Sequence, residues 1–145
     1  MEFYIEELEN FTLDLPLALN KLLKQINEDA RALKEADIKN MINSSSNHLF
    51  VARRSDNKEI VGMLSLIVYR IPVWKKGWIE DIVVDREYRN KGIATQLIRH
   101  AIEKAKAKRV LSLNLTSSPQ RQAANRLYKR LGFEKRNTNV YQIKV

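Results

Sequence analysis

The stretch from Gly77 to Thr95, GWIEDIVVDREYRNKGIAT, constrains the fold of this chain more than any other segment. Its apolar run, Ile82 to Val84, is typical of a buried strand, and the basic turn after it leads into a helix that opens on Gly92. Such a turn directs several backbone N–H groups towards one point at the positive end of a helix dipole. The sequence therefore predicts a strand–turn–helix unit that can hold a phosphate or pyrophosphate.

Two acidic residues, Glu80 and Asp81, precede this apolar run on the same predicted strand. Successive side chains of a strand point to opposite faces, so Glu80 is expected on the face of Trp78 and Ile82, and Asp81 on the other face. Only one of the two carboxylates should then face a given pocket. The chain thus places two candidates for acid–base chemistry beside a predicted anion site, and the alternation leaves open which of them acts.

The length and composition predict one globular domain that spans residues 1–145. The chain is 44% hydrophobic and 30% charged, and it contains no cysteine, which excludes disulfides, thiolate zinc ligands and a cysteine nucleophile. Its two histidines lie in no metal-ligand pattern, so no metal is expected. The N-terminus lacks the features of a signal peptide, and no apolar run approaches the roughly 20 residues that cross a bilayer. A cytoplasmic protein without membrane contact is expected.

The net charge of +9 favours phosphorylated or polyanionic ligands through long-range steering. A lysine-rich, solvated surface explains the same charge without any ligand. One basic cluster, Lys104 to Arg109, falls near the end of a predicted helix, where cations complement the helix dipole. No series of base-stacking aromatic residues and no helix-turn-helix pattern accompanies the charge, so a nucleic-acid partner is not expected.

The periodicity of apolar residues and the turn residues between them predict seven strands and four helices. The strands are predicted at 3–8, 48–53, 60–71, 78–84, 110–115, 133–135 and 140–145, and the helices at 15–26, 35–42, 90–106 and 119–131. Gly132 is expected to end the last helix in the left-handed conformation. This order predicts an α/β (α+β) architecture with a mixed central sheet of about seven strands and helices on both faces.

Two motifs resemble those of one known family. The hexapeptide from Arg89 to Ala94, RNKGIA, fits the pattern R/Q-x-x-G-x-G/A, and the segment from Ala124 to Phe133, ANRLYKRLGF, resembles A-x-x-L-Y-x-x-x-G-F. With a strand predicted between them, the pair resembles the GNAT superfamily of acetyl-CoA-dependent N-acetyltransferases, and the likeness covers most of the chain from about His48 onward. It implies the acyl-CoA N-acyltransferase fold, with acetyl-CoA as cosubstrate and no metal.

The resemblance also implies how acetyl-CoA would be held. The backbones of Ile82, Val83 and Val84 would pair with the pantetheine arm like an added strand. The pyrophosphate would be held by the backbone N–H groups of Asn90, Lys91, Gly92, Ile93, Ala94 and Thr95. Arg89 and Lys91 would add positive charge, although they could equally be ordinary surface cations. Many family members have an asparagine seven residues before the tyrosine of the second motif; this chain has Arg121 there, and Asn125 is a second candidate.

Two residues are candidates for proton transfer. An ammonium ion has no lone pair, so amine acetylation needs a base, and Glu80 resembles the glutamate base of family members. An ion pair with a nearby Lys or Arg is the alternative role for Glu80. Tyr128 would act as the general acid that protonates the departing thiolate of CoA, and a tyrosine at helical spacing can instead belong to the core.

The resemblance implies that a primary amine attacks acetyl-CoA directly in a ternary complex, and the lack of cysteine excludes a cysteinyl acyl-enzyme. The sequence does not identify the acceptor. Two other functions stay open, namely a catalytically silent acyl-CoA-binding regulatory protein and an acetyltransferase that acts on a macromolecule such as a protein or charged tRNA. A homodimer also stays open, because the last two predicted strands could form a dimer edge.

Overall fold

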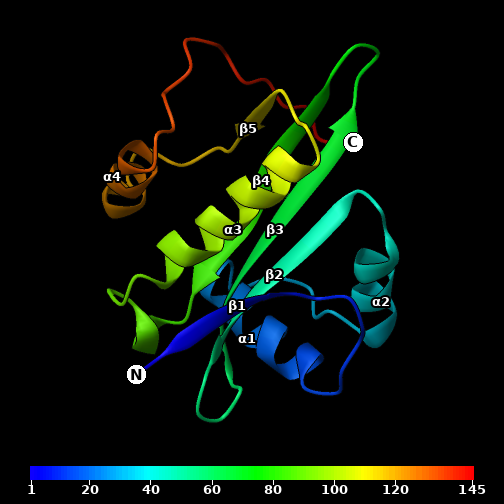
Figure 1. Cartoon of the computed structure of the whole chain (residues 1–145), viewed down its shortest axis with the longest axis vertical. Helices are drawn as coiled ribbons and strands as arrows, with labels where there is room; N and C mark the ends of the chain where they lie inside the picture. Colours follow the sequence, from blue (N-terminus) through cyan, green and yellow to red (C-terminus); the bar gives the residue numbers. More distant parts are fainter. The chain divides into compact units, whose positions relative to one another are not determined.

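The computed structural model describes all residues from Met1 to Val145, and they form two compact units, 1–115 and 116–145 (Figure 1). The strands are β1 (Phe3–Glu7), β2 (Asn47–Arg54), β3 (Ile60–Arg70), β4 (Lys75–Val84) and β5 (Ser112–Asn114). The helices are α1 (Leu15–Ile26), α2 (Glu35–Asn43), the short 3-10 helix η1 (Arg86–Tyr88), α3 (Ile93–Ala107) and α4 (Gln122–Arg130). The first unit contains all five strands, and α4 lies in the second.

The five strands form one mixed sheet in the order β1-β2-β3-β4-β5. Neighbouring strands are antiparallel from β1 to β4, whereas β5 runs parallel to β4. Helices α1 and α2 lie between β1 and β2, and short loops join β2 to β3 and β3 to β4. A parallel pair needs a crossover connection, and α3 supplies it. The predicted mixed sheet is therefore confirmed, but the prediction of about seven strands is wrong.

The two missing strands are those predicted at 133–135 and 140–145. The structure has no strand after Asn114, and the side chains of Val140, Tyr141 and Ile143 are exposed. An apolar, β-branched segment fits a strand, but it becomes one only when a neighbouring strand accepts its backbone hydrogen bonds. No strand pairs with these residues, so the expected dimer edge rests on strands that the structure does not contain.

Helices cover both faces of the sheet, as predicted. On one face, the leucine side chains of α1 and Ile38 of α2 pack against the sheet in a buried apolar cluster. The buried members are Leu8, Leu15, Leu19, Leu22, Ile38, Leu49, Val51, Ile60, Met63 and Val83. The three buried leucines of α1 recur at helical spacing, which gives that helix one continuous apolar stripe.

Helix α3 covers the other face, and Gly62 of β3 lets it approach closely. A Cβ atom at Gly62 would lie 3.3 Å from Leu97 Cδ1 and 3.4 Å from Ile93 Cγ2, both on α3. The same atom would lie 3.3 Å from the carbonyl oxygen of Val83 on β4. The absence of a side chain at this position therefore fixes how the start of α3 sits against the sheet. No helix in the chain has both the length and the apolarity required to cross a membrane.

Candidate active site

Strand β4 carries a bulge at the two predicted acids. Ser65 of β3 faces Glu80, whereas Met63 faces Val83, so β4 has one more residue than β3 over this interval. The extra residue is accommodated where Asp81 adopts a left-handed backbone conformation with φ of +50°. Because Met63 and Ser65 are two apart, they share a face of β3, and their partners Glu80 and Val83 consequently share a face of β4.

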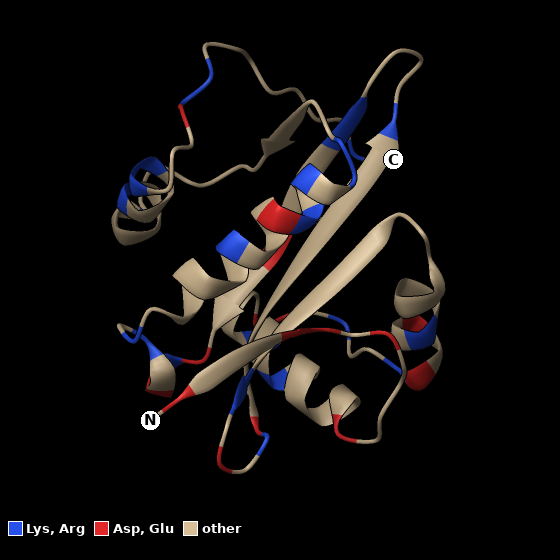
Figure 2. Cartoon of the chain, in the orientation of Figure 1, with Lys and Arg blue, Asp and Glu red and all other residues tan.

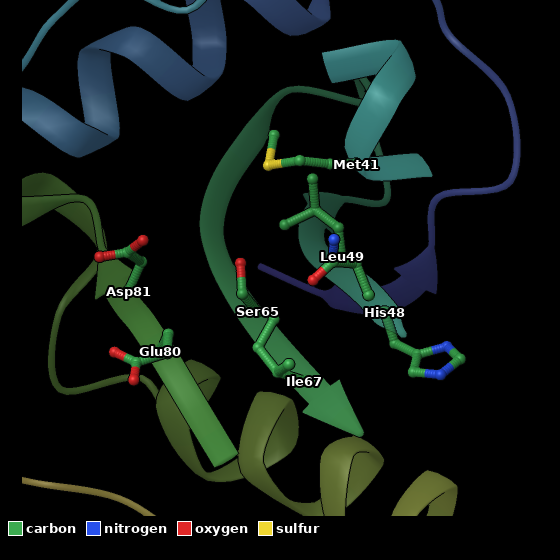
Figure 3. A pocket seen from close by; sticks show the side chains of 8 residues that line it. Met41, His48, Leu49, Ser65, Ile67, Glu80 and Asp81 are labelled. Atoms are coloured by element: carbon green, nitrogen blue, oxygen red, sulfur yellow. The ribbon is translucent and has the colours of Figure 1, made fainter. Parts of the chain in front are cut away.

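The bulge corrects the expectation that only one of the two acids could face a pocket. Glu80 and Asp81 both line a cavity of about 250 Å³ on the α1 and α2 face of the sheet (Figure 3). The other lining residues are Met41, Asn47, His48, Leu49, Ser65 and Ile67. Figure 3 shows the two carboxylates side by side along β4, while the imidazole of His48 points away from them. In a regular strand, successive side chains point to opposite faces, so one of the two carboxylates would lie on the α3 face of the sheet.

One edge of β4 is open beside this cavity. Strand β5 pairs only with Lys76, Gly77 and Trp78, so residues 79–84 have no strand neighbour on that edge within the sheet. An extended ligand can add to such an edge through main-chain hydrogen bonds. The predicted pantetheine segment, Ile82 to Val84, lies in this open part. One of its acceptors is already engaged, since the Arg89 Nε–H donates to the carbonyl oxygen of Val84 at 3.3 Å.

The basic turn after β4 has the geometry of an anion cradle. Asn90 and Gly92 have left-handed φ values of +61° and +78°, so α3 begins at Ile93 and not at Asn90 as predicted. The first helical hydrogen bond runs from the Gln96 N–H to the carbonyl oxygen of Gly92 at 3.1 Å. The N–H groups of the three residues from Ile93 to Thr95 therefore have no acceptor within the helix. Apart from Gly92 itself and its two chain neighbours, no residue has an atom within 4 Å of the position that a Cβ on Gly92 would occupy.

The side chains around this turn are mostly exposed cations. Arg89 and Lys91 are exposed and form no ion pair, whereas the side chain of Ile93 is buried beneath the turn. Lys and Arg residues are spread over many other elements of both units as well (Figure 2). The turn therefore combines free backbone donors with local positive charge, which is what a pyrophosphate requires.

Asp85 fastens the end of β4 to α1 and η1, a role that the sequence analysis missed. Its side chain is buried, it accepts a hydrogen bond from the Glu87 N–H at 3.1 Å, and it pairs with Lys21 of α1 at 3.1 Å. Gln25 of α1 also accepts a hydrogen bond from the Arg86 N–H at 3.1 Å. An aspartate directly after an apolar strand was the available signal, but its partners lie some 60 residues earlier in the chain.

The contacts of Asp85 make the stability of this junction depend on pH. Burial alone raises the pKa of this carboxyl, but the Glu87 N–H and the Lys21 ammonium outweigh burial and hold the pKa below its usual value. A lowered folded-state pKa contributes stability that is present above the unfolded pKa, about 3.9, and is lost as pH falls through the folded pKa.

Asp85→Asn should therefore lower the free energy of unfolding at pH 7 by about 1–3 kcal/mol, the typical cost when a buried group loses its hydrogen-bonded partner. The difference from the wild type should begin to shrink below about pH 4, where the carboxyl of the unfolded chain takes up a proton, and it should vanish once pH falls below the lowered folded-state pKa. Urea unfolding at both pH values measures this. Asp56→Asn is the matched control, because Asp56 pairs with Arg54 at the surface and should change little at either pH. A loss for Asp85→Asn that is equal at both pH values would contradict the assignment.

The remaining predicted site residues lie in the second unit. Tyr128 of α4 is buried, and its ring meets Phe133 edge to face with centroids 6.1 Å apart. Burial raises the pKa of the Tyr128 phenol, against a smaller opposing effect from the charge of Arg121. The phenol is therefore protonated at neutral pH. Arg121 is the exposed residue that caps α4, and the Asn125 amide donates to the carbonyl oxygen of Ser118 at 3.0 Å.

Comparisons with known proteins identify the family. Residues 16–133 match the acetyltransferase (GNAT) family, and the chain therefore belongs to that family. The L-2,4-diaminobutyric acid acetyltransferase of Marinococcus halophilus is 32% identical over 87 residues, which are 59% of this chain and 48% of that protein. The chain spans less than half the length of the curated relatives it matches.

Solved structures share the fold over the whole chain. A transcriptional regulator from Bacillus halodurans superposes with a TM-score of 0.84 at 25% identity, covering 99% of this chain and 100% of that one. The aminoglycoside acetyltransferase AAC(6')-Iy, in complex with a CoA bisubstrate analogue, superposes with a TM-score of 0.81 at 16% identity, covering 100% and 99%. The second likeness speaks for the fold alone. Both agree with a mixed sheet that carries helices on its two faces.

Proposed function

We propose that this protein is an N-acetyltransferase that transfers the acetyl group of acetyl-CoA to a primary amine of a small acceptor, by direct attack in a ternary complex. The observation that best supports the proposal is the combination of features along β4. One segment of this strand provides two carboxylates to a cavity, leaves its backbone edge open, and runs into the anion cradle at the start of α3. Family membership supports the same reading.

Acetyl-CoA would supply the activated acetyl group, and the residues present suit it. The open edge at Ile82 to Val84 has main-chain groups for the amides of the pantetheine arm. The free N–H groups of Ile93 to Thr95 suit the pyrophosphate, with Arg89 and Lys91 adding charge. The left-handed Gly92 leaves space in front of its Cα for close approach of an anion.

Glu80 is the proposed base. The acceptor amine is an ammonium ion in neutral solution and must lose a proton before its nitrogen can attack. Glu80 faces the cavity and forms no ion pair or side-chain hydrogen bond with another residue, so its carboxylate is available to receive that proton. As the new N–C bond forms, the C–S bond breaks and the sulfur needs a proton. Tyr128 is the proposed donor, because its raised pKa keeps the phenol protonated.

Release of CoA tests the function directly. The protein is incubated with acetyl-CoA and each member of a panel of amines, amino sugars, polyamines, amino acids and peptides, and free thiol is measured. We expect thiol release that depends on the amine, and a rise in melting temperature with acetyl-CoA alone. A rise in melting temperature without thiol release across the panel would favour a silent acyl-CoA-binding regulator. No effect of acetyl-CoA on the melting temperature would contradict both functions.

Gly92→Ala tests the anion cradle. Alanine at a φ of +78° should lower the free energy of unfolding by roughly 1–2 kcal/mol, and its methyl group would project where the anion approaches. We expect acetyl-CoA to bind about tenfold more weakly, because close backbone approach is what glycine permits. Isothermal titration calorimetry measures the dissociation constant.

Gly132→Ala is the matched control for that variant. Gly132 also has a left-handed φ, of +99°, with no atom within 4 Å of the added Cβ. It should lose similar stability and keep its affinity for acetyl-CoA. Equal weakening of acetyl-CoA binding in the two variants would show that backbone strain, and not the cradle, caused the effect.

A further inference from the structure

We infer that the acceptor carries a second positive charge besides the amine that reacts, and that Asp81 is the residue that selects it. This inference rests on the proposed function, since it names the substrate class of the same cavity. Its structural basis is the bulge in β4. The left-handed backbone at Asp81 brings two consecutive carboxylates into one cavity, which a regular strand cannot do.

Both carboxylates lack a cationic partner within the protein. Every ion pair in the chain involves other acids, and neither Glu80 nor Asp81 accepts a side-chain hydrogen bond. No Lys or Arg lines the cavity, although the chain has 26 of them and a net charge of +9. The cavity is thus an acidic hollow in a basic protein. Two adjacent like charges repel each other, and a ligand with two cationic groups relieves that repulsion better than one with a single charge.

The rest of the cavity suits an aliphatic chain between the two charges. Met41, Leu49 and Ile67 offer apolar surface. The polar residues besides the two acids are Asn47, Ser65 and His48, and the His48 imidazole points away from the carboxylates (Figure 3). Its volume of about 250 Å³ lies below the range of pockets for drug-sized ligands, roughly 300–1,000 Å³. A short diamine matches this combination. A carboxylate or phosphate beside the reacting amine would instead meet Asp81 and be repelled.

The two carboxylates then have different tasks. The reacting nitrogen loses its proton to Glu80, while the second nitrogen stays an ammonium ion and pairs with Asp81. Asp81 touches the acceptor without taking part in bond formation, so it determines specificity and orients the chain. Its removal should alter the ratio between acceptors more than the rate of the chemical step.

Three five-carbon amines test the inference: 1,5-diaminopentane, 5-aminopentan-1-ol and 5-aminopentanoate, in which the second group is cationic, neutral and anionic. We expect kcat/KM for the diamine to exceed that for the amino alcohol by about tenfold, the scale of one charge-assisted hydrogen bond. This is more than the twofold that two equivalent amines give by statistics. The amino acid should be the poorest acceptor.

Asp81→Asn removes the charge and keeps a residue that tolerates the left-handed conformation. In this variant the ratio of diamine to amino alcohol should fall from about ten to about two, the statistical value, because the charge-assisted contact is lost. Glu103→Gln is the control, because Glu103 is an exposed acid on α3, on the opposite face of the sheet. It removes the same charge and should leave the wild-type ratio intact.

Calorimetric binding of the diamine and of the amino alcohol is measured in parallel, so that the result does not depend on turnover. Equal binding or equal kcat/KM of the two probes in the wild type overturns the inference while leaving the acetyltransferase in place. An unchanged ratio in Asp81→Asn overturns the role of Asp81. Tight diamine binding that is lost in Asp81→Asn, without thiol release, would support a dicationic ligand for this cavity and contradict the proposed function.

Discussion

Glu80→Gln should lower kcat for amine acetylation by about 100- to 10,000-fold, the usual contribution of a positioned general base. Glutamine has nearly the same shape and fits the same place in β4, but it cannot take a proton. Glu80 forms no ion pair, so the substitution should leave folding intact, and the affinity for acetyl-CoA should stay within about twofold, as expected for a residue that acts in the chemical step.

The pH dependence separates a base from a mere binding group. If Glu80 takes the proton of the ammonium ion, the variant should recover part of its rate at high pH, where more of the amine is already neutral. Steady-state rates from pH 6 to 10 with one amine measure this. A pH profile parallel to that of the wild type would count against Glu80 as the base. A loss of kcat in Asp81→Asn larger than that in Glu80→Gln would reverse the roles of the two acids.

Tyr128→Phe should lower kcat by about 100-fold, the lower end of the range for general acid catalysis. The change removes only the hydroxyl group, and the ring can keep its edge-to-face contact with Phe133. Because burial raises the pKa of this phenol, the wild-type side chain is a proton donor throughout the neutral range. The dissociation constant of acetyl-CoA should change little.

Tyr141→Phe provides the matched control for this variant. Tyr141 is the other tyrosine of the second unit, and it is exposed. Its loss of a hydroxyl group should not alter kcat. If Tyr128→Phe weakens acetyl-CoA binding while kcat at saturation is unchanged, Tyr128 is a binding residue and the general acid must be sought elsewhere.

Local patterns predicted the elements of the first unit well. Apolar periodicity placed α1, α2 and the strands β1 to β4 within a few residues of their ends, because each buries one face against its neighbours. The segments at 133–135 and 140–145 show the limit of this reasoning. The residues at 140–145 favour a strand, but a strand also needs a partner, and sequence composition does not report whether one is in reach.

The site shows the same division between local and non-local information. The motif from Arg89 to Ala94 predicted the turn before α3, in which Gly92 is left-handed, since the glycine and the charges are contained in the motif itself. The binding of an anion there stays a prediction. The orientation of Glu80 and Asp81 could not be predicted, because the bulge exists only in the register between β3 and β4. The contacts of Asp85 with Lys21 and Gln25 depend on how α1 packs against the end of β4. They could not be predicted from the residues next to Asp85 in the sequence.

The open edge of β4 also bears on how the protein avoids its own aggregation. An unpaired strand edge is a template on which another chain can add a strand, and natural sheets discourage this with bulges and charged residues. Residues 79–84 contain both devices, the bulge at Asp81 and two consecutive carboxylates. A second β4 brought to this edge would have to pair across the bulge and would bring its own carboxylates close to Glu80 and Asp81. The proposed pantetheine arm carries no such charge and would pair only with Ile82 to Val84, beyond the bulge. The bulge and the two carboxylates on which the proposed acceptor site depends would thus also discourage the pairing of this edge with a second copy of the chain.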